Sequence, residues 1–200
     1  MSVIETPGRR AVAAHAYDRQ DDDWYTENRW CSRRLFDEEK FNGPIHDPCC
    51  GSGRIVEAAR AAGHEATGAD LRDRGFGYDV RDFFLDPGPY TNVVSNHPFD
   101  LSEEFARHAV DVAQRKVAMI MPTRRLNAAW PWITALPFYR LWFLTPRPSM
   151  PPGPMAMQLE AQGKQPSGDT KDYCWLVFLK DFEGRAETRW LHRDPAEQPA

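Results

Sequence analysis

The chain has 200 residues and a mass of 22.9 kDa, a length that favours a single folded domain. Its 42% hydrophobic and 27% charged residues exclude a fibrous or largely disordered protein. The formal net charge of −4 argues against a general binder of polyanions. No apolar run approaches the ~20 residues of a membrane span, and charges stand where a signal peptide has its apolar core. We therefore expect a cytoplasmic protein with no membrane partner.

Residues 1–23 show no sustained periodicity and end in an acidic run, so we predict a mobile N-terminal arm. The folded domain is expected over residues 24–192, and residues 193–200 are predicted to be a disordered tail. A helix over residues 28–40 has its apolar residues at helical spacing and is stopped by Asn42-Gly43-Pro44. This helix precedes the first strand.

From residue 45 onward, short apolar runs alternate with amphipathic stretches. Strands that alternate with helices pair in parallel, which predicts a Rossmann-like three-layer α/β/α fold with a seven-stranded, mostly parallel sheet. The last strand is expected to close the sheet antiparallel, because a proline- and glycine-rich link without a helix, residues 146–168, precedes it. Residues 151–154 of that link are predicted to be a rigid loop. The predicted strands are 45–48, 65–70, 77–80, 90–96, 117–122, 140–145 and 173–180, and the helices are 28–40, 54–62 and 102–115.

The cysteines form neither a CxxC pair nor a spaced cluster with histidines. This pattern supports neither a disulfide framework nor a structural zinc site. We therefore expect a reduced compartment and no metal. The cysteines are Cys31, Cys49, Cys50 and Cys174.

The predicted strand-to-helix turn at residues 47–53 has the sequence Asp-Pro-Cys-Cys-Gly-Ser-Gly. Glycines let the backbone approach a ligand closely, and free N–H groups at a helix start favour an anionic group such as a carboxylate. The turn has neither the spacing nor the Lys-Ser/Thr pair of a P-loop, which disfavours nucleoside triphosphates. An ordinary tight turn without a ligand is the alternative interpretation.

Two segments give the sequence a resemblance to a known family. The turn at 47–53 resembles the DPxCGSG form of motif I in class I S-adenosylmethionine-dependent methyltransferases, especially those that methylate exocyclic amino groups of DNA bases. Residues 95–99, Ser-Asn-His-Pro-Phe, resemble their catalytic (Asn/Asp/Ser)-Pro-Pro-(Tyr/Phe/Trp) motif, with a histidine in place of the first proline. The resemblance extends over residues 24–192.

The resemblance implies S-adenosyl-L-methionine as the cofactor. Asp70 ends the second strand where a carboxylate would accept both ribose hydroxyls, although an acid there is also a common helix cap. Asp82 and Phe83 fall where the family places an acid on the adenine amino group and a ring on the adenine face. Tyr25 and Thr26 match the segment that touches the methionine end, with an aromatic staple against the first helix as the alternative. The implied cofactor-binding residues are Tyr25, Thr26, Asp47, Pro48, Cys49, Gly51, Gly53, Asp70, Leu71, Asp82, Phe83 and Asn96.

The implied catalytic residues are Asn96, His97, Pro98 and Phe99. An exocyclic amino nitrogen is a poor nucleophile because its lone pair is delocalised into the ring, so an enzyme must accept hydrogen bonds from its N–H groups. Asn96 can offer its side-chain oxygen and His97 its backbone carbonyl, while Phe99 stacks on the extruded base. Histidine at position 97 gives up the rigidity of proline. Tolerated variation, an altered substrate, and a decayed site that only binds the cofactor are the three interpretations.

Three further segments resemble small phage and prophage adenine methyltransferases: residues 122–126, 145–150 and 169–178. Seven basic residues and one acid give the segment 105–150 a charge of +6, which leaves −10 for the rest of the chain. Arg124, Arg125 and Arg147 follow predicted strand ends, where open α/β sheets bind ligands, so they are candidates for contacts with DNA phosphates. A solvated helix face explains the arginines of the preceding helix. Trp130 and Trp132 could stack bases, but beside Pro131 and Pro137 they are interpreted as aromatics that pack a loop.

The sequence thus predicts a methyltransferase that uses S-adenosyl-L-methionine and methylates adenine N6 in DNA, of phage or prophage type. No separate target-recognition domain fits in 200 residues, so specificity must be short, loose or lent by another chain, such as the partner in a homodimer. One alternative is an enzyme of the same fold that acts on an RNA base or a protein glutamine amide, which the acidic composition favours slightly. The other is a cofactor-binding accessory protein without activity.

Overall fold

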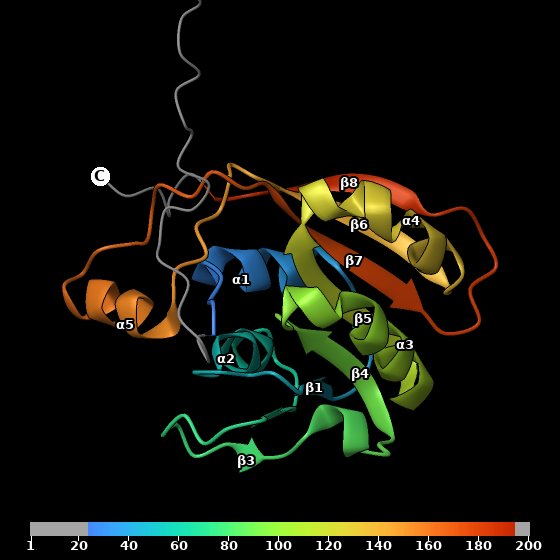
Figure 1. The fold of residues 1–200 in the computed structure, drawn as a ribbon, viewed down its shortest axis with the longest axis horizontal. Coiled ribbons are helices and arrows are strands. Elements are labelled where there is room, and N and C mark those ends of the chain that lie inside the picture. The colour runs from blue at the N-terminus through green and yellow to red at the C-terminus, as the bar shows by residue number, and fades with distance from the viewer. Residues whose placement is uncertain (1–23, 195–200) are drawn as a thin grey trace, which may run out of the picture.

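The computed structural model describes residues 24–194 (Figure 1). The predicted arm at 1–23 and residues 195–200 of the predicted tail lie outside the described residues. Arg193, which the sequence also assigns to the tail, donates its backbone N–H to the carbonyl of Thr145 at 2.8 Å. In the described part of the chain, no helix is both long enough and apolar enough to cross a membrane.

The described residues form an eight-stranded sheet in the order β3-β2-β1-β4-β5-β7-β6-β8. Strands β3, β2, β1, β4 and β5 pair in parallel, whereas β7 runs antiparallel to both β5 and β6. The predicted Rossmann-like α/β class and the antiparallel strand are therefore confirmed. The strands are β1 (Ile45–Asp47), β2 (Ala66–Asp70), β3 (Asp79–Val80), β4 (Tyr90–Ser95), β5 (Ala113–Pro122), β6 (Phe138–Thr145), β7 (Tyr173–Leu179) and β8 (Glu187–His192).

This sheet has one strand more than the seven that the sequence predicts. β8 pairs in parallel with β6 at the edge of the sheet, and Leu191 is its only buried residue. A strand with a single buried residue lacks the alternation of apolar and polar residues by which strands are recognised. The strand count from the sequence is therefore wrong by this edge strand, while the class is right.

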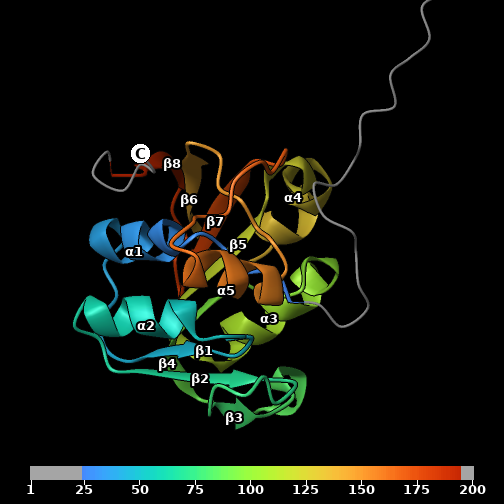
Figure 2. The same ribbon diagram turned by 90° about the vertical axis from the view of Figure 1, so that its left-hand side faces the viewer.

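Helices cover both faces of the sheet (Figure 2). Buried residues of α1 and α2 form one core cluster with the sheet, and those of α3 and α4 form a second. Val93 and Val94, which are neighbours in β4, belong to opposite clusters because successive strand residues point to opposite faces. The helices are α1 (Arg29–Glu38), α2 (Arg54–Ala61), α3 (Ser102–Val112), α4 (Leu126–Thr134) and α5 (Gly153–Ala161).

Helices α4 and α5 replace segments that the sequence predicts to be irregular. α4 contains Pro131 and nevertheless buries Trp132, which is 8% exposed, so the interpretation of Trp132 as a loop aromatic is wrong. The prediction of a rigid loop at 151–154 is also wrong, because Gly153 and Pro154 begin α5. Proline fits the first turn of a helix, where its missing N–H would have no intrahelical partner. The prolines of the link therefore mark a helix start and not a continuous loop.

Candidate functional site

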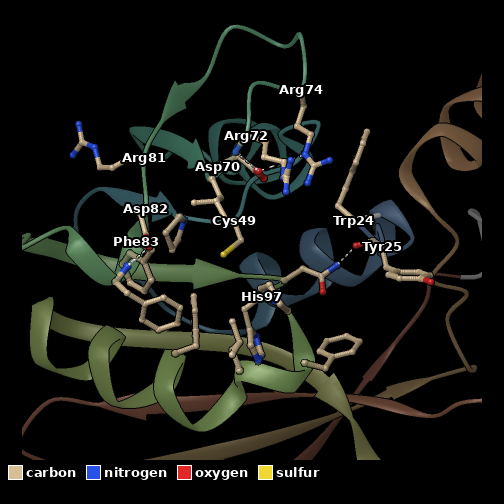
Figure 3. Close-up of a pocket in the computed structure, with 18 residues that line it drawn as sticks. Trp24, Tyr25, Cys49, Asp70, Arg72, Arg74, Arg81, Asp82, Phe83 and His97 are labelled. Atoms are coloured by element: carbon tan, nitrogen blue, oxygen red, sulfur yellow. Dashed lines mark hydrogen bonds and ion pairs between the residues drawn. The ribbon is translucent and has the colours of Figure 1, made fainter. Parts of the chain in front are cut away.

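A cavity of about 380 Å³ opens where β1, β2 and β4 end (Figure 3), and we call it the main cavity. Open α/β sheets bind their ligands at the carboxyl ends of the strands, and the main cavity lies at this end of the sheet. Most of the predicted site residues are brought together here from five separate segments. Those that line the main cavity are Tyr25, Pro48, Cys49, Asp70, Leu71, Asp82, Phe83, Asn96, His97, Pro98 and Phe99.

A second cavity of about 20 Å³, called the small cavity below, shares Tyr25, Cys49 and Asn96 with the main cavity. It lies between the turn at 47–53 and the segment before α1. The predicted residues that line it without lining the main cavity are Thr26, Asp47 and Gly51, and they are joined by Glu27 and Arg54, which the sequence analysis did not identify.

Both glycines of the turn have left-handed backbone conformations, with φ of +52° at Gly51 and +88° at Gly53. A Cβ at Gly51 would lie 2.7 Å from Cδ1 of Trp24, so glycine is required for the indole to lie on the turn. Gly53 lines neither cavity, and a Cβ there would lie 2.0 Å from the hydroxyl of Tyr78. Gly51 thus lines the small cavity, whereas Gly53 packs against Tyr78 beside it.

The Asp70 carboxylate links the end of β2 to the turn. Its Oδ2 accepts a hydrogen bond from the N–H of Gly51 at 2.9 Å, and its Oδ1 accepts one from the N–H of Arg72 at 3.2 Å. The guanidinium of Arg74 is ion-paired to Oδ1 at 3.4 Å and lies over the ring of Trp24 (Figure 3). Since a carboxylate has about four acceptor sites, Asp70 braces the turn and retains acceptor capacity towards the cavity.

Asp82 and Phe83 both line the main cavity, but their surroundings differ. Asp82 Oδ1 accepts a hydrogen bond from the N–H of Phe84 at 3.0 Å and caps the short 3₁₀ turn Phe83–Leu85. Phe83 is 5% exposed and packs on Phe105 with 5.1 Å between ring centroids. Phe84, which the sequence analysis did not single out, lines the cavity with 40% of its surface exposed. Phe84 is therefore the ring better placed to cover a ligand at the mouth.

Asn96 has a fixed amide orientation. Its Nδ2 donates to the carbonyl of Tyr25 at 2.8 Å and to Oε2 of Glu27 at 2.9 Å. Both partners are acceptors only, so the nitrogen must face them. Oδ1 forms no hydrogen bond with any described residue. Because Asn96 lines the main cavity, Oδ1 remains as an acceptor for a ligand there.

His97 fixes the loop that follows β4 through its side chain. Its Nε2 lies 2.8 Å from Oγ of Ser102, which donates its own proton to the carbonyl of Phe99 at 2.8 Å. Nε2 must therefore carry the ring proton. Burial lowers the pKa of His97 to about 3, and the charge of Arg125 acts in the same direction, so the ring is neutral at pH 7. This chain of hydrogen bonds restrains the loop where the related motif has proline.

Asp47 is a buried residue that connects the turn at 47–53 to the end of β4. Burial raises its pKa to about 8, although hydrogen bonds oppose the shift. Oδ1 accepts from Oγ of Ser95 at 2.7 Å and from the N–H of Cys49 at 3.1 Å. These bonds join the ends of β1 and β4, so the predicted cofactor residue Asp47 holds the two motifs in register.

No family model matches this sequence, and no curated protein does either. Solved structures do match. A TehB-like S-adenosylmethionine-dependent methyltransferase from Corynebacterium glutamicum is 17% identical with a TM-score of 0.50, over 75% of this chain and 87% of that one. A ribosomal protein L11 methylase from Lactobacillus delbrueckii subsp. bulgaricus is 13% identical with a TM-score of 0.51, over 74% of this chain and 77% of that one.

A third match is a modification subunit assigned to a type I restriction enzyme from Vibrio vulnificus. It is 13% identical with a TM-score of 0.50, and the match covers 84% of this chain and 46% of the other. At these identities the likeness concerns the fold. The chain has the fold of the S-adenosylmethionine-dependent methyltransferases.

The methyltransferase fold implies S-adenosylmethionine as cofactor, and unpaired polar atoms in the small cavity fit its charged end. Trp24 Nε1, Thr26 Oγ1 and Arg54 Nε are buried, and none has a hydrogen-bond partner among the described residues. All three side chains line the small cavity. Leaving a buried donor unpaired costs about 1–3 kcal/mol. A carboxylate, such as that of the methionyl group, would satisfy these donors, and Asp70 and Asp82, which the sequence resemblance assigns to the adenosine, line the main cavity.

The three arginines predicted to bind phosphates have different surroundings on this methyltransferase fold. Arg125 is ion-paired to Asp100 and donates to the carbonyl of Phe99 at 2.8 Å. Arg147 is ion-paired to Asp172 at 2.8 Å. Arg124 is exposed and has no such partner among the described residues. Arg124 is thus the most available of the three for an added anion.

Proposed function

We propose that this protein is an S-adenosylmethionine-dependent methyltransferase that methylates an exocyclic amino group, adenine N6 of DNA. The observation that carries the proposal is the fixed amide of Asn96, which presents Oδ1 to the main cavity beside the turn at 47–53. A hydrogen-bond acceptor at this point favours a target that offers N–H groups. The resemblance of residues 95–99 to the motif of amino methyltransferases supports the same target.

The roles of the residues follow from their positions. The cofactor supplies an electrophilic methyl group on a sulfonium sulfur. Asn96 Oδ1 accepts a hydrogen bond from the target amino group, so that the nitrogen lone pair is less delocalised and faces the methyl group. The backbone carbonyl of His97 is the second acceptor, and Phe99 stacks on the base. Holding the two reacting groups in line lowers the barrier further, because positioning replaces a bimolecular encounter.

The direct test is transfer of tritiated methyl from S-adenosylmethionine to unmodified duplex DNA, followed by digestion and separation of the nucleosides. Label in N6-methyladenine is the expected result. RNA and a glutamine-containing peptide are assayed in parallel. Label in either of these and not in DNA would mean that the substrate is RNA or protein instead of DNA. Cofactor binding with no transfer to any of the three would mean that the protein is an accessory protein without activity.

Replacing Asp70 by alanine is expected to weaken S-adenosylmethionine binding by about 10- to 100-fold, as loss of a charged hydrogen-bond partner of roughly 1.5–3 kcal/mol predicts. The turn also loses the bond from the Gly51 N–H. Isothermal titration calorimetry measures the change. Asp73→Ala is the matched control, because Asp73 is exposed and, among residues 24–194, accepts only from the N–H of Gly75. Equal dissociation constants for the two variants would remove Asp70 from the cofactor site.

Charge reversal at Arg124 is expected to reduce DNA affinity more than the same change at Arg147. Asp172 already neutralises Arg147, whereas Arg124 carries an uncompensated charge. Loss of one phosphate contact lowers the slope of log affinity against log salt by about 0.9. Binding titrations at several salt concentrations test this, with Arg115→Glu at the opposite end of β5 as control. A similar loss in all three variants would mean that only net charge matters.

A further inference from the structure

Glu27 is a buried carboxylate that neither motif of the sequence includes. It precedes α1 and is 3% exposed. Its Oε1 accepts a hydrogen bond from Oγ of Ser32 at 2.8 Å, and its Oε2 accepts one from Nδ2 of Asn96 at 2.9 Å. Arg54 donates to the backbone carbonyl of Glu27 at 2.6 Å. Both carboxylate oxygens are thus directed at specific partners, and one of these is the central residue of the candidate site.

The Glu27 carboxylate and the Tyr25 carbonyl together disfavour one of the two orientations that the Asn96 amide can adopt. An ionised carboxylate and a backbone carbonyl can only accept hydrogen bonds. If the Asn96 amide were rotated by half a turn, Oδ1 would face Glu27 Oε2 and the Tyr25 carbonyl, and two hydrogen bonds would be replaced by repulsion between oxygens. Neighbouring hydrogen bonds also polarise one another, so a carboxylate on Nδ2 makes Oδ1 a stronger acceptor.

We propose that Glu27 is a positioning residue, which holds Asn96 Oδ1 towards the main cavity and thereby selects targets that donate an N–H group at that point. This inference rests on the proposed function, since the acceptor acts on the target amino group. Ser32, which is fully buried in α1, keeps the carboxylate in place. The orientation of the acceptor therefore depends on the packing of α1 and not only on the loop that carries Asn96.

A reciprocal exchange of the two side-chain types tests the proposal. Asn96→Asp sets a second carboxylate against Glu27, and methyl transfer should fall by about 100-fold or more. Combining it with Glu27→Gln restores a donor–acceptor pair, because the amide introduced at position 27 can donate an N–H to the new carboxylate. The double variant should recover at least about tenfold over Asn96→Asp, although recovery is partial because the Tyr25 carbonyl has lost its donor.

The kinetic constants separate positioning from a general structural effect. We expect Glu27→Gln alone to lower kcat by about tenfold, because only the Tyr25 carbonyl then opposes the rotated amide, and the dissociation constant of S-adenosylmethionine is measured alongside because Glu27 also lines the small cavity. Glu57→Gln is the matched control, since Glu57 is exposed on α2 and pairs with Arg29. A double variant no more active than Asn96→Asp, or equal effects of Glu27→Gln and Glu57→Gln, would overturn the proposal.

A measurement without turnover keeps this result distinct from the proposed function. The Asn96 side-chain amide signal, identified in ¹⁵N NMR spectra by its loss in Asn96→Ala, should be protected from hydrogen exchange and should lose protection in Glu27→Gln but not in Glu57→Gln. An unprotected amide in the parent protein refutes the positioning proposal itself. A protected amide in a protein that transfers methyl to none of the substrates instead refutes the proposed function, and the catalytic role of Glu27 with it.

Discussion

Replacing Asn96 by alanine is expected to reduce kcat for methyl transfer by about 100- to 1,000-fold, the range found when one preorganised hydrogen-bonding group is removed from a reacting centre. Asn96 lines the main cavity and its Oδ1 has no hydrogen bond to a described residue, so under the proposed function the substitution removes the acceptor for the target amino group. Binding of S-adenosylmethionine should change far less, because the turn at 47–53, Asp70 and Asp82 are left intact. Single-turnover kinetics with tritiated cofactor measure the rate, and calorimetry measures the binding.

The same substitution also leaves Glu27 without one of its two donors, which costs about 1–3 kcal/mol of folding free energy. Thermal unfolding of the variant therefore has to accompany the kinetics. Asn42→Ala is a suitable control, because Asn42 is exposed in the loop before β1, at the opposite end of that strand from the cavity. Equal kcat values for the Asn96 variant, its control and the parent protein would exclude Asn96 from the reaction.

Most of the strands that the sequence predicts are ones that are buried almost continuously. Strands β1, β2, β4, β5 and β7 are buried along most of their length, and apolar runs mark them. The sequence does not predict β8, because it is an edge strand with one buried residue. It does not predict α4 and α5 either, because their prolines suggest irregular chain. α3 ends at Val112 instead of 115, because the following residues enter β5.

The candidate site likewise contains residues that the sequence predicts and residues that it does not. The glycine turn and the segment 95–99 are local, so their residue types and order are visible in one sequence. Trp24, Glu27 and Arg54 acquire their roles only when the chain brings the segment before α1 against that turn. Phe83 is buried whereas Phe84 is exposed, and this difference depends on the 3₁₀ turn capped by Asp82. No spacing rule in the sequence distinguishes such residues from ordinary packing residues.

In the positively charged segment 105–150, the role of each basic residue depends on what it contacts in the fold. Lys116 and Arg140 contribute to its charge of +6, yet both side chains are mostly buried and bind the same carboxylate, that of Glu39. Arg107 pairs with Glu103 within α3. The charge of the segment is therefore largely compensated by contacts with other parts of the fold, and the surface open to DNA phosphates is smaller than the sequence suggests.

Glu39 joins the end of α1 to two strands of the sheet. Its side chain is 1% exposed, and one oxygen contacts Lys116 Nζ of β5. The other accepts from Nη1 of Arg140 at 2.6 Å and from Nε1 of Trp142 at 3.0 Å, both in β6. Desolvating an ion pair offsets much of its attraction, but removing only one partner leaves the remaining charges buried and uncompensated. Glu39 is therefore a position where a single change should destabilise the sheet.

Glu39→Gln is expected to destabilise the protein by about 3–5 kcal/mol, the cost of breaking a buried ion pair. For a domain of this size, each kcal/mol corresponds to roughly 2–4 °C in Tm, so the melting temperature should fall by on the order of 10 °C. Glu38→Gln is the matched control, because Glu38 is one residue earlier, exposed, and paired with Arg34 at the surface. Its change should stay within about 1 kcal/mol. Equal shifts in denaturant midpoint for the two variants would mean that the buried cluster contributes no more than a surface pair, and that apolar packing alone holds α1 on the sheet.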